Sequence, residues 1–510
     1  MRRDGLSALV AGDRPEVGRL AGALERAGVN VRRATGAVPA EDDSERPRDI
    51  VVAASTDLPA AATASGLAGR LWLPAVGLPS DLELLVAAPA ALVDAAPLAR
   101  WVLCPSERVR GLVDAGLAAV AKRTVVLPLG TEDEPGAGDL DAAVAALLDR
   151  TFPATPWPGR TRPLRVVVAG HALHFLDAIT EWLRGVDDVE LRIDHVTSFA
   201  RHDEAASAAH VEWADTVLCE WASPVAAWYS RHKRPGQRLV VRLHRAELYS
   251  SWWHDIDIEA VDQVVCVSGH YARLTRETTG WPAEKVVVIP NYVDSAVLDR
   301  PKLAGAPFTL GMMGVTPRRK RLDLALDLAE RLRAADPRFS LHVKSQFAWD
   351  LPWAWRDPEE RAAAEQVLRR VRGVPALADG VVFDAYGPDV GAWLRKVGWV
   401  VSLSDDESFH LAPAEGMASG AVPLIRPWPG AETIYDRRWI ASADEGAGLV
   451  EELADRVLAG ARDGTWDALR SEAQRQARRS FDVVAVCERF ARVLVEDLEP
   501  AAAEFPVRAG

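Results

Sequence analysis

Cysteine is scarce in this chain: there are four residues among 510, and they are scattered. Cys104, Cys219, Cys266 and Cys487 lack the close spacing of metal ligands, and most lie in apolar stretches typical of strands. A structural zinc site is therefore not expected. Buried, reduced thiols in a cytoplasmic protein fit the pattern better.

Long apolar runs and an excess of positive charge are also lacking. No apolar run approaches the ~18 residues that a membrane-spanning helix needs. A secretory signal is not expected either, because Asp13, Arg14 and Pro15 interrupt the short apolar patch near the start. The net charge of −13 argues against general affinity for nucleic acid or anionic lipid, whose phosphates require a basic surface.

The length is sufficient for about three domains, and two stretches in the first 300 residues echo one another. Residues 101–106 (WVLCPS) and 124–128 (TVVLP) correspond to residues 263–268 (QVVCVS) and 286–290 (VVVIP). The interval from cysteine to proline is 24 positions in both copies. This match suggests a duplicated domain; chance similarity between two βα units is the alternative.

A third unit begins near residue 308 and again alternates strands with helices. The apolar pattern predicts strands at the ranges 308–313, 340–344, 381–385 and 399–403, and helices at 322–335 and 483–498. Apolar strands joined by helices are typical of parallel sheets with helices on both faces. The whole chain is therefore expected to have an α/β fold.

Two glutamates, Glu407 and Glu415, border a predicted strand-to-helix connection. Glu407 follows the strand, and Glu415 lies about one turn into a helix that starts near Leu411 and ends at Gly420. Free backbone N–H groups and the dipole attract phosphate to such a helix start. Two carboxylates beside an anion site suit a nucleotide sugar, which has both phosphate and hydroxyl groups. An ordinary connection with two surface glutamates is the alternative.

This segment resembles the donor-binding motif of the retaining GT-B glycosyltransferases of family 4, roughly E-G-F-G-x-x-x-x-E-A-M-A-x-G-x-P. Residues 407–423 read ESFHLAPAEGMASGAVP. In the family the first glutamate contacts the transferred sugar, the second holds the ribose, and the backbone amides between them meet sugar or phosphate. The resemblance thus implies a catalytic role for Glu407 and donor contacts at Ser408, Phe409, His410, Leu411 and Glu415. Ser408 and His410 replace two family glycines and are expected to add side chains near the sugar.

The resemblance covers about residues 160–498 and implies a GT-B fold, with two facing Rossmann-like domains. The predicted division is an extra N-terminal Rossmann-like domain, a degenerate duplicate (1–135), a linker (136–162), an acceptor-side domain (163–300), a nucleotide-sugar donor domain (301–480), and a C-terminal crossover helix with a tail (481–510). The linker prediction rests on a stretch rich in proline and glycine.

Ligands of open α/β sheets lie beyond the C-terminal ends of the strands. His244 follows a predicted strand, 239–243, where the family usually has a histidine that faces the reacting sugar. A histidine suits a polarising or proton-donating role near neutral pH, so His244 is the second catalytic candidate. A structural histidine is the alternative. The first copy of the duplicated domain, residues 1–135, has no histidine in the corresponding segment 75–79 (AVGLP). A second active site is therefore not expected there.

Several loop residues near His244 are candidates for the acceptor side. Gly170 and His171 follow the strand near 166–168, where a ligand loop and a structural turn are both plausible. Aromatic faces stack on sugar rings, and Trp252 and Trp253 follow the His244 loop. Packing between domains is the alternative for most of the 18 tryptophans. The acceptor-side candidates are Gly170, His171, Arg245, Trp252 and Trp253.

A run of four cations follows the strand at 308–313 and opens onto a helix. Cations are unfavourable at a helix N-terminus unless an anion occupies the site, and a diphosphate is such an anion. The family pattern here is G-R-L-x-x-x-K-G; Gly314 and Lys320 align with it, Val315 replaces its arginine, and Arg318 or Arg319 is expected to compensate. A solvated basic turn is the alternative. Lys344 is a further donor candidate, with a surface lysine as its alternative.

These features predict a hexosyltransferase-type enzyme that moves a sugar, with retention, from a nucleotide-diphosphate sugar to a glycan, a lipid-linked or a small-molecule acceptor. No metal and no cofactor are expected, because the resemblance implies that cationic side chains and a helix N-terminus neutralise the leaving diphosphate. Two alternatives stay open: a non-catalytic subunit that binds sugar nucleotides or glycans, and a sugar-nucleotide epimerase. Peripheral membrane contact, and a homo-oligomer formed through the first domain, also stay open.

Overall fold

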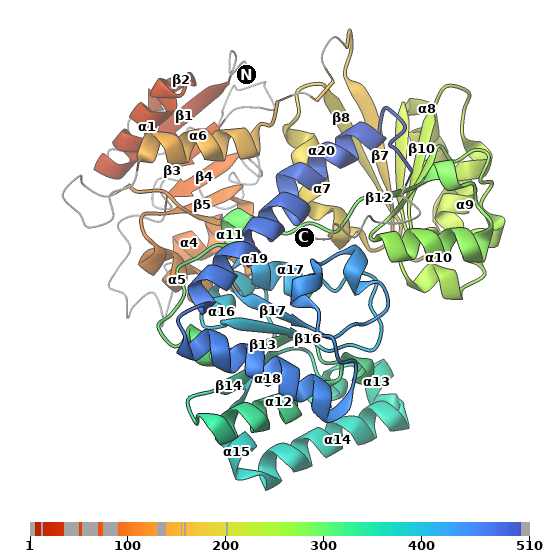
Figure 1. Ribbon diagram of the computed structural model, residues 1–510. Coiled ribbons are helices and arrows are strands. Elements are labelled where there is room, and N and C mark those ends of the chain that lie inside the picture. Colours follow the sequence, from red (N-terminus) through yellow and green to blue (C-terminus); the bar gives the residue numbers. More distant parts are fainter. Residues whose placement is uncertain are drawn as a thin grey trace. The chain divides into compact units, whose positions relative to one another are not determined.

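The structure is a computed structural model, and it describes residues 6–11, 14–34, 50–53, 70–74, 90–129, 139–154, 156–157, 160–199 and 202–500. Two compact units are present: Met1–Ala154 with Gly387–Trp393, and Thr155–Tyr386 with Leu394–Gly510. Together they contain three parallel sheets, each accompanied by helices (Figure 1). The expected α/β fold is therefore confirmed.

The first unit is built on a six-stranded parallel sheet in the order β2-β1-β3-β4-β5-β6. Its strands are β1 (Ser7–Ala11), β2 (Asn30–Ala34), β3 (Ile50–Ala53), β4 (Leu71–Pro74), β5 (Trp101–Cys104) and β6 (Thr124–Val126). Its helices are α1 (Pro15–Arg26), α4 (Ala90–Ala95), α5 (Glu107–Gly116) and α6 (Leu140–Thr151). β1, β3, β4 and β5 are apolar and almost fully buried, as parallel strands covered by helices are, whereas Asn30, Arg32 and Arg33 of the edge strand β2 are exposed.

Part of the predicted linker, 136–162, belongs to this first core. Val144, Leu147 and Leu148 of α6 are buried in the same cluster as the apolar face of α1. The packed part of the first unit thus extends beyond residue 135. Residues 130–138 lie outside the described part of the chain. Residues 75–79, where no histidine corresponds to His244, also lie outside it.

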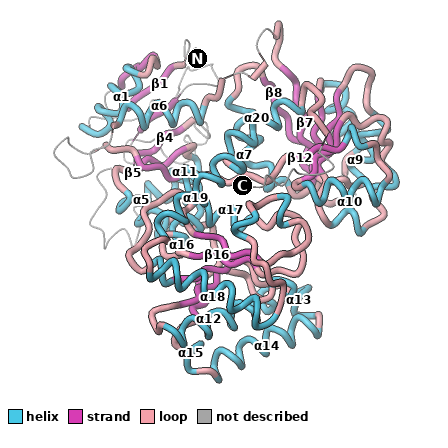
Figure 2. The backbone as a smooth tube through the Cα atoms, in the orientation of Figure 1, coloured by secondary structure: helices cyan, strands magenta, loops and turns pink. Residues whose placement is uncertain are grey.

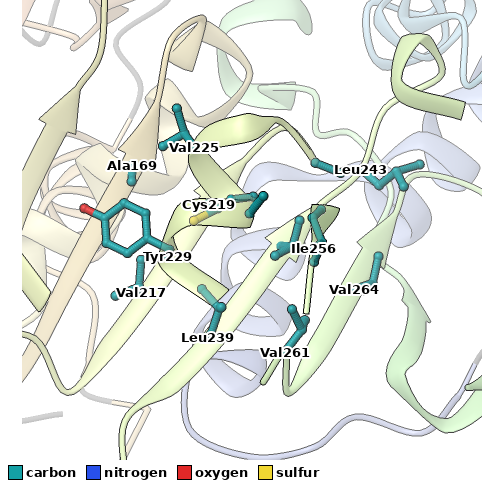
Figure 3. Close-up of a cluster of buried hydrophobic side chains, with 14 of the residues drawn as sticks. Ala169, Val217, Cys219, Val225, Tyr229, Leu239, Leu243, Ile256, Val261 and Val264 are labelled. Atoms are coloured by element: carbon teal, nitrogen blue, oxygen red, sulfur yellow. The ribbon is translucent and has the colours of Figure 1, made fainter. Parts of the chain in front are cut away.

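The second sheet also has six parallel strands, in the order β12-β11-β10-β9-β7-β8. The strands are β7 (Leu164–Gly170), β8 (Val189–His195), β9 (Thr216–Glu220), β10 (Arg238–Arg242), β11 (Gln263–Cys266) and β12 (Val286–Val288). The helices are α7 (Asp177–Gly185), α8 (Glu204–Trp213), α9 (Pro224–His232), α10 (Gly269–Thr279) and α11 (Ser295–Leu298). Figure 3 shows one face of this sheet, where Val217, Cys219 and Leu239 pack with side chains of α9.

The first two sheets share one topology, because β2-β1-β3-β4-β5-β6 and β8-β7-β9-β10-β11-β12 run in the same order. The resemblance extends to local detail. Ser106 and Ser268 each follow a strand-end cysteine by two positions, adopt extended backbone, and cap the next helix by accepting a hydrogen bond from a backbone N–H at 3.3 Å. The two sheets are thus alike in strand order and in this cap, and the duplication itself stays a prediction.

The third sheet has five parallel strands in the order β15-β14-β13-β16-β17. They are β13 (Thr309–Met313), β14 (Ser340–Lys344), β15 (Val381–Asp384), β16 (Trp399–Ser402) and β17 (Val422–Ile425). The accompanying helices are α12 (Leu322–Ala335), α13 (Pro352–Arg356), α14 (Pro358–Gly373), α15 (Pro375–Ala378), α17 (Leu411–Ala418), α18 (Gly446–Arg462) and α19 (Trp466–Phe481). Helix α16 (Val390–Leu394) lies between β15 and β16 in the sequence, and most of it is grouped with the first unit. The strands and the helix predicted in this unit all form, within a residue or two of their expected ends.

The last helix, α20 (Val483–Val493), returns to the second sheet. It lies along α7 (Figure 1), and Val486, Cys487 and Phe490 are buried in the core on that face of the sheet. Thr216 and Arg238, from β9 and β10, donate hydrogen bonds to the backbone carbonyls of Leu494 and Val493. The helix that follows the third sheet in the sequence thus packs on the second sheet.

Figure 2 shows how loops connect the helices and strands of these sheets. No helix in the described part of the chain combines the length and the apolar character that crossing a membrane requires. All four cysteines are buried and none forms a disulfide, as the sequence predicts.

Candidate active site

The C-terminal edge of the second sheet carries a buried ionic cluster. Glu220 and Arg242 end neighbouring strands and are register partners, so their side chains leave the sheet on the same face. A guanidinium nitrogen of Arg242 donates to Glu220 Oε1 at 2.7 Å, and the two side chains are 1% and 0% exposed. His244 lies two residues beyond Arg242, so its side chain leaves the chain on the same face. Its Nε2 is 2.8 Å from Glu220 Oε1.

Aromatic rings surround His244. Trp221, whose backbone has a φ of 75°, stacks on the imidazole with ring centroids 4.0 Å apart, and Phe175 lies at 5.2 Å. The backbone N–H of His244 donates to Glu247, a buried carboxyl whose pKa is raised by burial. The loop that carries His244 is therefore fixed by contacts at both its backbone and its ring.

The C-terminal edge of the third sheet carries a second cluster, around Glu407. Lys320 ends a short 3₁₀ turn, Arg318–Lys320, just before α12, and its ammonium lies 2.5 Å from Glu407 Oε1. Arg319 lies 3.4 Å from the same carboxylate oxygen and also donates to the backbone carbonyl of Asp406. Two of the four predicted cations thus converge on the first glutamate of the motif.

Opposing effects set the charge on Glu407, which is 8% exposed. Burial disfavours its ionised form, but the nearby cationic groups outweigh burial and lower its pKa to about 2. Burial lowers the pKa of His410 to about 3, so this ring is neutral at neutral pH and the cations present there are Lys320 and Arg319. Burial also lowers the pKa of Lys320, because Glu407 only partly offsets the desolvation of its ammonium. At neutral pH Glu407 is ionised.

Helix α17 begins directly after this loop, as the motif predicts. His410 is its N-cap residue, in the left-handed region with a φ of 54°, and its side chain does not cap the helix. Glu415 is half-buried one turn into the helix, and Gly420, with a φ of 80°, ends the turn beyond it. No N-cap side chain occupies the helix start; of its first backbone groups, Pro413 has no N–H and the N–H of Ala414 is bonded to the Tyr435 hydroxyl.

The loops at the C-terminal edges of the second and third sheets contact each other through Arg245 and Asp406, which are adjacent to His244 and Glu407. The guanidinium of Arg245, directly after His244, lies 2.6 Å from the carboxylate of Asp406, directly before Glu407. Tyr271, at the start of α10, donates to the other oxygen of Asp406 at 3.5 Å. Folding therefore brings together two loops that are more than 150 positions apart in the sequence.

Four predicted donor contacts are placed elsewhere. Arg318 is 57% exposed and pairs with Glu359 of α14. Lys344 is buried and donates to the carbonyl of Ala385 at 2.8 Å, so it is neither a surface lysine nor directed at the Glu407 cluster. The side chain of Phe409 packs in the core against Phe481, and His410 turns inward to Ser402, its Nδ1 2.6 Å from the hydroxyl. The His410 ring is buried, yet it still interacts electrostatically with Glu407, so its contribution near the sugar stays a prediction.

The remaining predicted residues divide between site and scaffold. Trp252 stacks on Phe199, whose edge meets Trp221, so Trp252 belongs to the aromatic wall beside His244. Trp253 packs against the apolar core of the second sheet instead. His171 meets the edge of the Phe199 ring and lies 3.0 Å from the carbonyl of Val196. Of the other predicted residues, Gly170 ends β7, Leu411 begins α17, and Gly314 and Ser408 lie in the connections after β13 and β16; their ligand contacts stay predictions.

Gly170 has a packing reason to be glycine. A Cβ at this position would lie 2.8 Å from the backbone oxygen of Glu220. The loop after β7 therefore passes close to the end of β9.

Sequence reasoning missed Glu220, Arg242 and Trp221. A signal was available, because Glu220 and Arg242 are the only charged side chains near the ends of two otherwise apolar strand segments, VLCE and LVVR. A charge at the end of a buried parallel strand needs a partner there, and the same strand ends form the ligand edge of the sheet.

Residues 153–297, which include this edge, match the family model described as Glycosyltransferase Family 4. The match covers less than a third of the chain and is a similarity to this family over the second sheet. HepE of Anabaena, solved in complex with UDP and glucose, is 15% identical, with 65% of this chain and 99% of HepE covered and a TM-score of 0.50. A glycosyltransferase from Rickettsia africae is 12% identical, covers 66% of this chain and 100% of its own, and has a TM-score of 0.50. At these identities the likeness concerns the fold. None of the curated proteins matches the chain.

Proposed function

We propose that this glycosyltransferase-type protein transfers a sugar, with retention of configuration and without a metal ion, from a nucleotide-diphosphate sugar. The acceptor would be a glycan, a lipid-linked or a small-molecule hydroxyl compound. The observation that carries the proposal is the pairing of Arg245 with Asp406, which places His244 and Glu407 on adjoining loops. Catalytic candidates on facing edges are what a sugar held between two domains requires.

The third sheet would hold the donor. Arg319 and Lys320 supply positive charge beside the start of α17, and together they suit the two phosphates. Glu407, ionised and held by Lys320, offers oxygens to the hydroxyls of the sugar, while Glu415 would accept hydrogen bonds from the ribose. As the bond from the sugar to the diphosphate breaks, the same cations stabilise the charge that develops on the leaving group.

The second sheet would hold the acceptor and the face of the sugar opposite Glu407. His244 is the group placed to contact the reacting sugar, and the wall formed by Trp221, Phe199 and Trp252 offers aromatic surface for a ring. HepE of Anabaena has been solved with UDP and glucose, so UDP-sugars are the first donors to test.

The proposal is tested by thermal-shift measurements against a panel of nucleotides and nucleotide sugars, followed by product analysis with and without candidate acceptors. A ligand that binds only the native state raises the unfolding temperature. Transfer to an acceptor supports the enzyme; release or isomerisation of the sugar without an acceptor indicates the epimerase. Binding without any turnover of a panel of acceptors indicates the non-catalytic subunit.

The two arginines of the cationic turn give a matched pair of variants. Arg319→Ala is expected to weaken UDP binding by roughly 1.5–3 kcal/mol, the scale of a charge-assisted hydrogen bond, because Arg319 faces the Glu407 cluster. Arg318→Ala is expected to change it by less than about 0.5 kcal/mol, because Arg318 pairs with Glu359 at the surface. Calorimetry with UDP and with uridine measures both variants. Equal losses in the two variants would contradict the assignment.

Glu415→Gln is expected to weaken binding of the free nucleotide diphosphate by roughly 1–3 kcal/mol, since an ionised acceptor for the ribose hydroxyls becomes neutral. Glu415 is half-buried on α17, a position open to a ligand. The control is the corresponding free sugar phosphate, which lacks the ribose and should bind the variant and the wild type equally. Unchanged affinity for the nucleotide, measured by calorimetry, would refute the ribose role.

A further inference from the structure

The buried carboxylate Glu220 lies directly beneath the imidazole of His244. β9 and β10 are parallel neighbours with Glu220 opposite Arg242 in register. Side chains alternate between the two faces of a strand, so Glu220 and Arg242 lie on the same face as Leu218 and Val240, which are buried against α7 and α20. This face is opposite to the one that Figure 3 shows. A carboxylate on this face cannot reach water, so it requires partners within the protein.

Arg242 and His244 both contact one carboxylate oxygen of Glu220, Oε1. Arg242 donates to Oε1 at 2.7 Å, and Nε2 of His244 lies 2.8 Å from the same atom. Arg242 is held in turn by Asn291 Oδ1 at 2.5 Å, which fixes the guanidinium under the carboxylate. A carboxylate paired with a buried guanidinium is ionised and has no proton to give. The proton between Glu220 and His244 therefore belongs to Nε2 of the imidazole.

This assignment leaves the other ring nitrogen, Nδ1, with its lone pair. Among the residues that the structure describes, none forms a hydrogen bond with Nδ1 of His244, and the side chain is 11% exposed. Trp221 and Phe175 cover the ring by stacking, and the nearby carboxyl of Glu247 is engaged by backbone N–H groups. The charged or titratable groups near the ring are Glu220, Arg242, whose Nη1 lies 3.5 Å from Nε2, and Glu247, whose carboxyl interacts electrostatically with the imidazole.

We propose that Glu220 is a positioning residue that holds His244 as the neutral Nε2–H tautomer, so that Nδ1 accepts a hydrogen bond from a substrate hydroxyl. The proposal rests on the proposed function for the identity of the substrate, but the tautomer is a property of the free protein. It defines His244 as a hydrogen-bond acceptor toward the sugar or the acceptor alcohol, rather than as a proton donor to the leaving group.

The tautomer can be measured without any substrate. Full-length protein with ¹⁵N-labelled histidine is examined by NMR at pH 7.5, and the His244→Gln variant identifies the His244 signals. The wild type is expected to show a protonated Nε2 and an unprotonated Nδ1. Glu220→Gln, which retains an oxygen in place, is expected to keep this tautomer. The double variant Glu220→Leu/Arg242→Met removes the acceptor without stranding a buried charge, and is expected to show a mixture of tautomers.

Kinetics supply the second measurement, on the nucleotide sugar that the thermal-shift panel selects. The double variant is expected to lose roughly 10–100-fold in kcat, by analogy with the loss when the carboxylate partner of a metal-ligating histidine is removed, with donor KM within about twofold of wild type. Asp194→Asn is the matched control. Asp194 is a buried carboxylate on β8 of the same sheet, bonded to Ser207 and Tyr229, and it should change neither the tautomer nor kcat.

Three results would overturn the proposal: a protonated Nδ1 in the wild type, an imidazolium in the wild type at pH 7.5, or an unchanged tautomer in a folded double variant. If the double variant does not fold, the wild-type spectrum still decides. If the panel selects no donor, the proposed function fails, while the tautomer remains measurable. The two failures are thereby distinguished.

Discussion

Replacing His244 with alanine is expected to lower kcat by ~10²–10⁴, the usual range for a positioned acid–base group. The imidazole is fixed between Glu220 and the face of Trp221, so it is already oriented before any substrate binds. Its contact with the reacting sugar is expected to strengthen in the transition state. The loss should therefore appear in kcat, while donor KM changes little, because the diphosphate contacts come from Arg319 and Lys320 in the other sheet.

His254→Ala is the matched control for this prediction. His254 follows the same loop region but is exposed and stacks on Trp253, away from the Glu220 cluster. It should retain wild-type kcat and KM, as measured with the nucleotide sugar that the panel selects. Near-normal turnover by a well-folded His244→Ala variant would refute the catalytic role and leave His244 as a residue that only shapes its loop.

The fold was predictable from the sequence because its signals are local and repeated. Apolar strands at regular intervals predict parallel sheets, and the repeated cysteine, serine and proline positions predict that two sheets share a topology. The serines prove to be helix caps, Ser106 and Ser268, which explains their fixed distance from the strand ends. The part of the predicted linker that forms α6 was not assigned to the first core, because a short amphipathic segment between prolines does not show which sheet its apolar side covers.

The candidate site was predictable where a residue's role follows from its position on an element. Glu407 and Lys320 are brought together at the strand ends, as the motif implies. Side-chain direction was not predictable. Arg318 and Arg319 are adjacent in the sequence, yet the 3₁₀ turn sends one to Glu359 and the other to Glu407. His410 occupies a glycine position by turning its ring into the core, which only the packing around Ser402 reveals.

Replacing Lys320 with methionine is expected to lower the free energy of unfolding by about 3 kcal/mol, the lower end of the range for breaking a buried ion pair. The carboxylate of Glu407 is 8% exposed and would lose its 2.5 Å partner, while Lys320 itself retains 15% exposure. Urea unfolding at pH 7 measures the effect. Diphosphate binding should be lost as well, since the same ammonium is proposed to meet the phosphates.

Acid should reduce this destabilisation. In the folded chain the pKa of Glu407 is about 2, below its ordinary value of 4.5. A carboxyl with a lowered folded pKa stabilises the fold fully above its unfolded pKa, and this contribution is lost as the pH falls through the folded value. The difference between wild type and Lys320→Met should therefore shrink as the pH falls from 4.5 toward 2. A difference that stays constant across this window would show that the methionine acts by packing rather than through charge.

A double-mutant cycle with Glu407→Gln separates the structural role of the pair from its role in binding. In Lys320→Met/Glu407→Gln no charge is stranded, because the partner of the missing ammonium is neutral. The double variant should regain most of the lost stability, to within about 1 kcal/mol of wild type. Its affinity for UDP should stay as low as that of Lys320→Met, because no cation has been restored beside the diphosphate. Recovery of UDP affinity together with stability would contradict the binding role and reduce the Lys320–Glu407 pair to a structural contact.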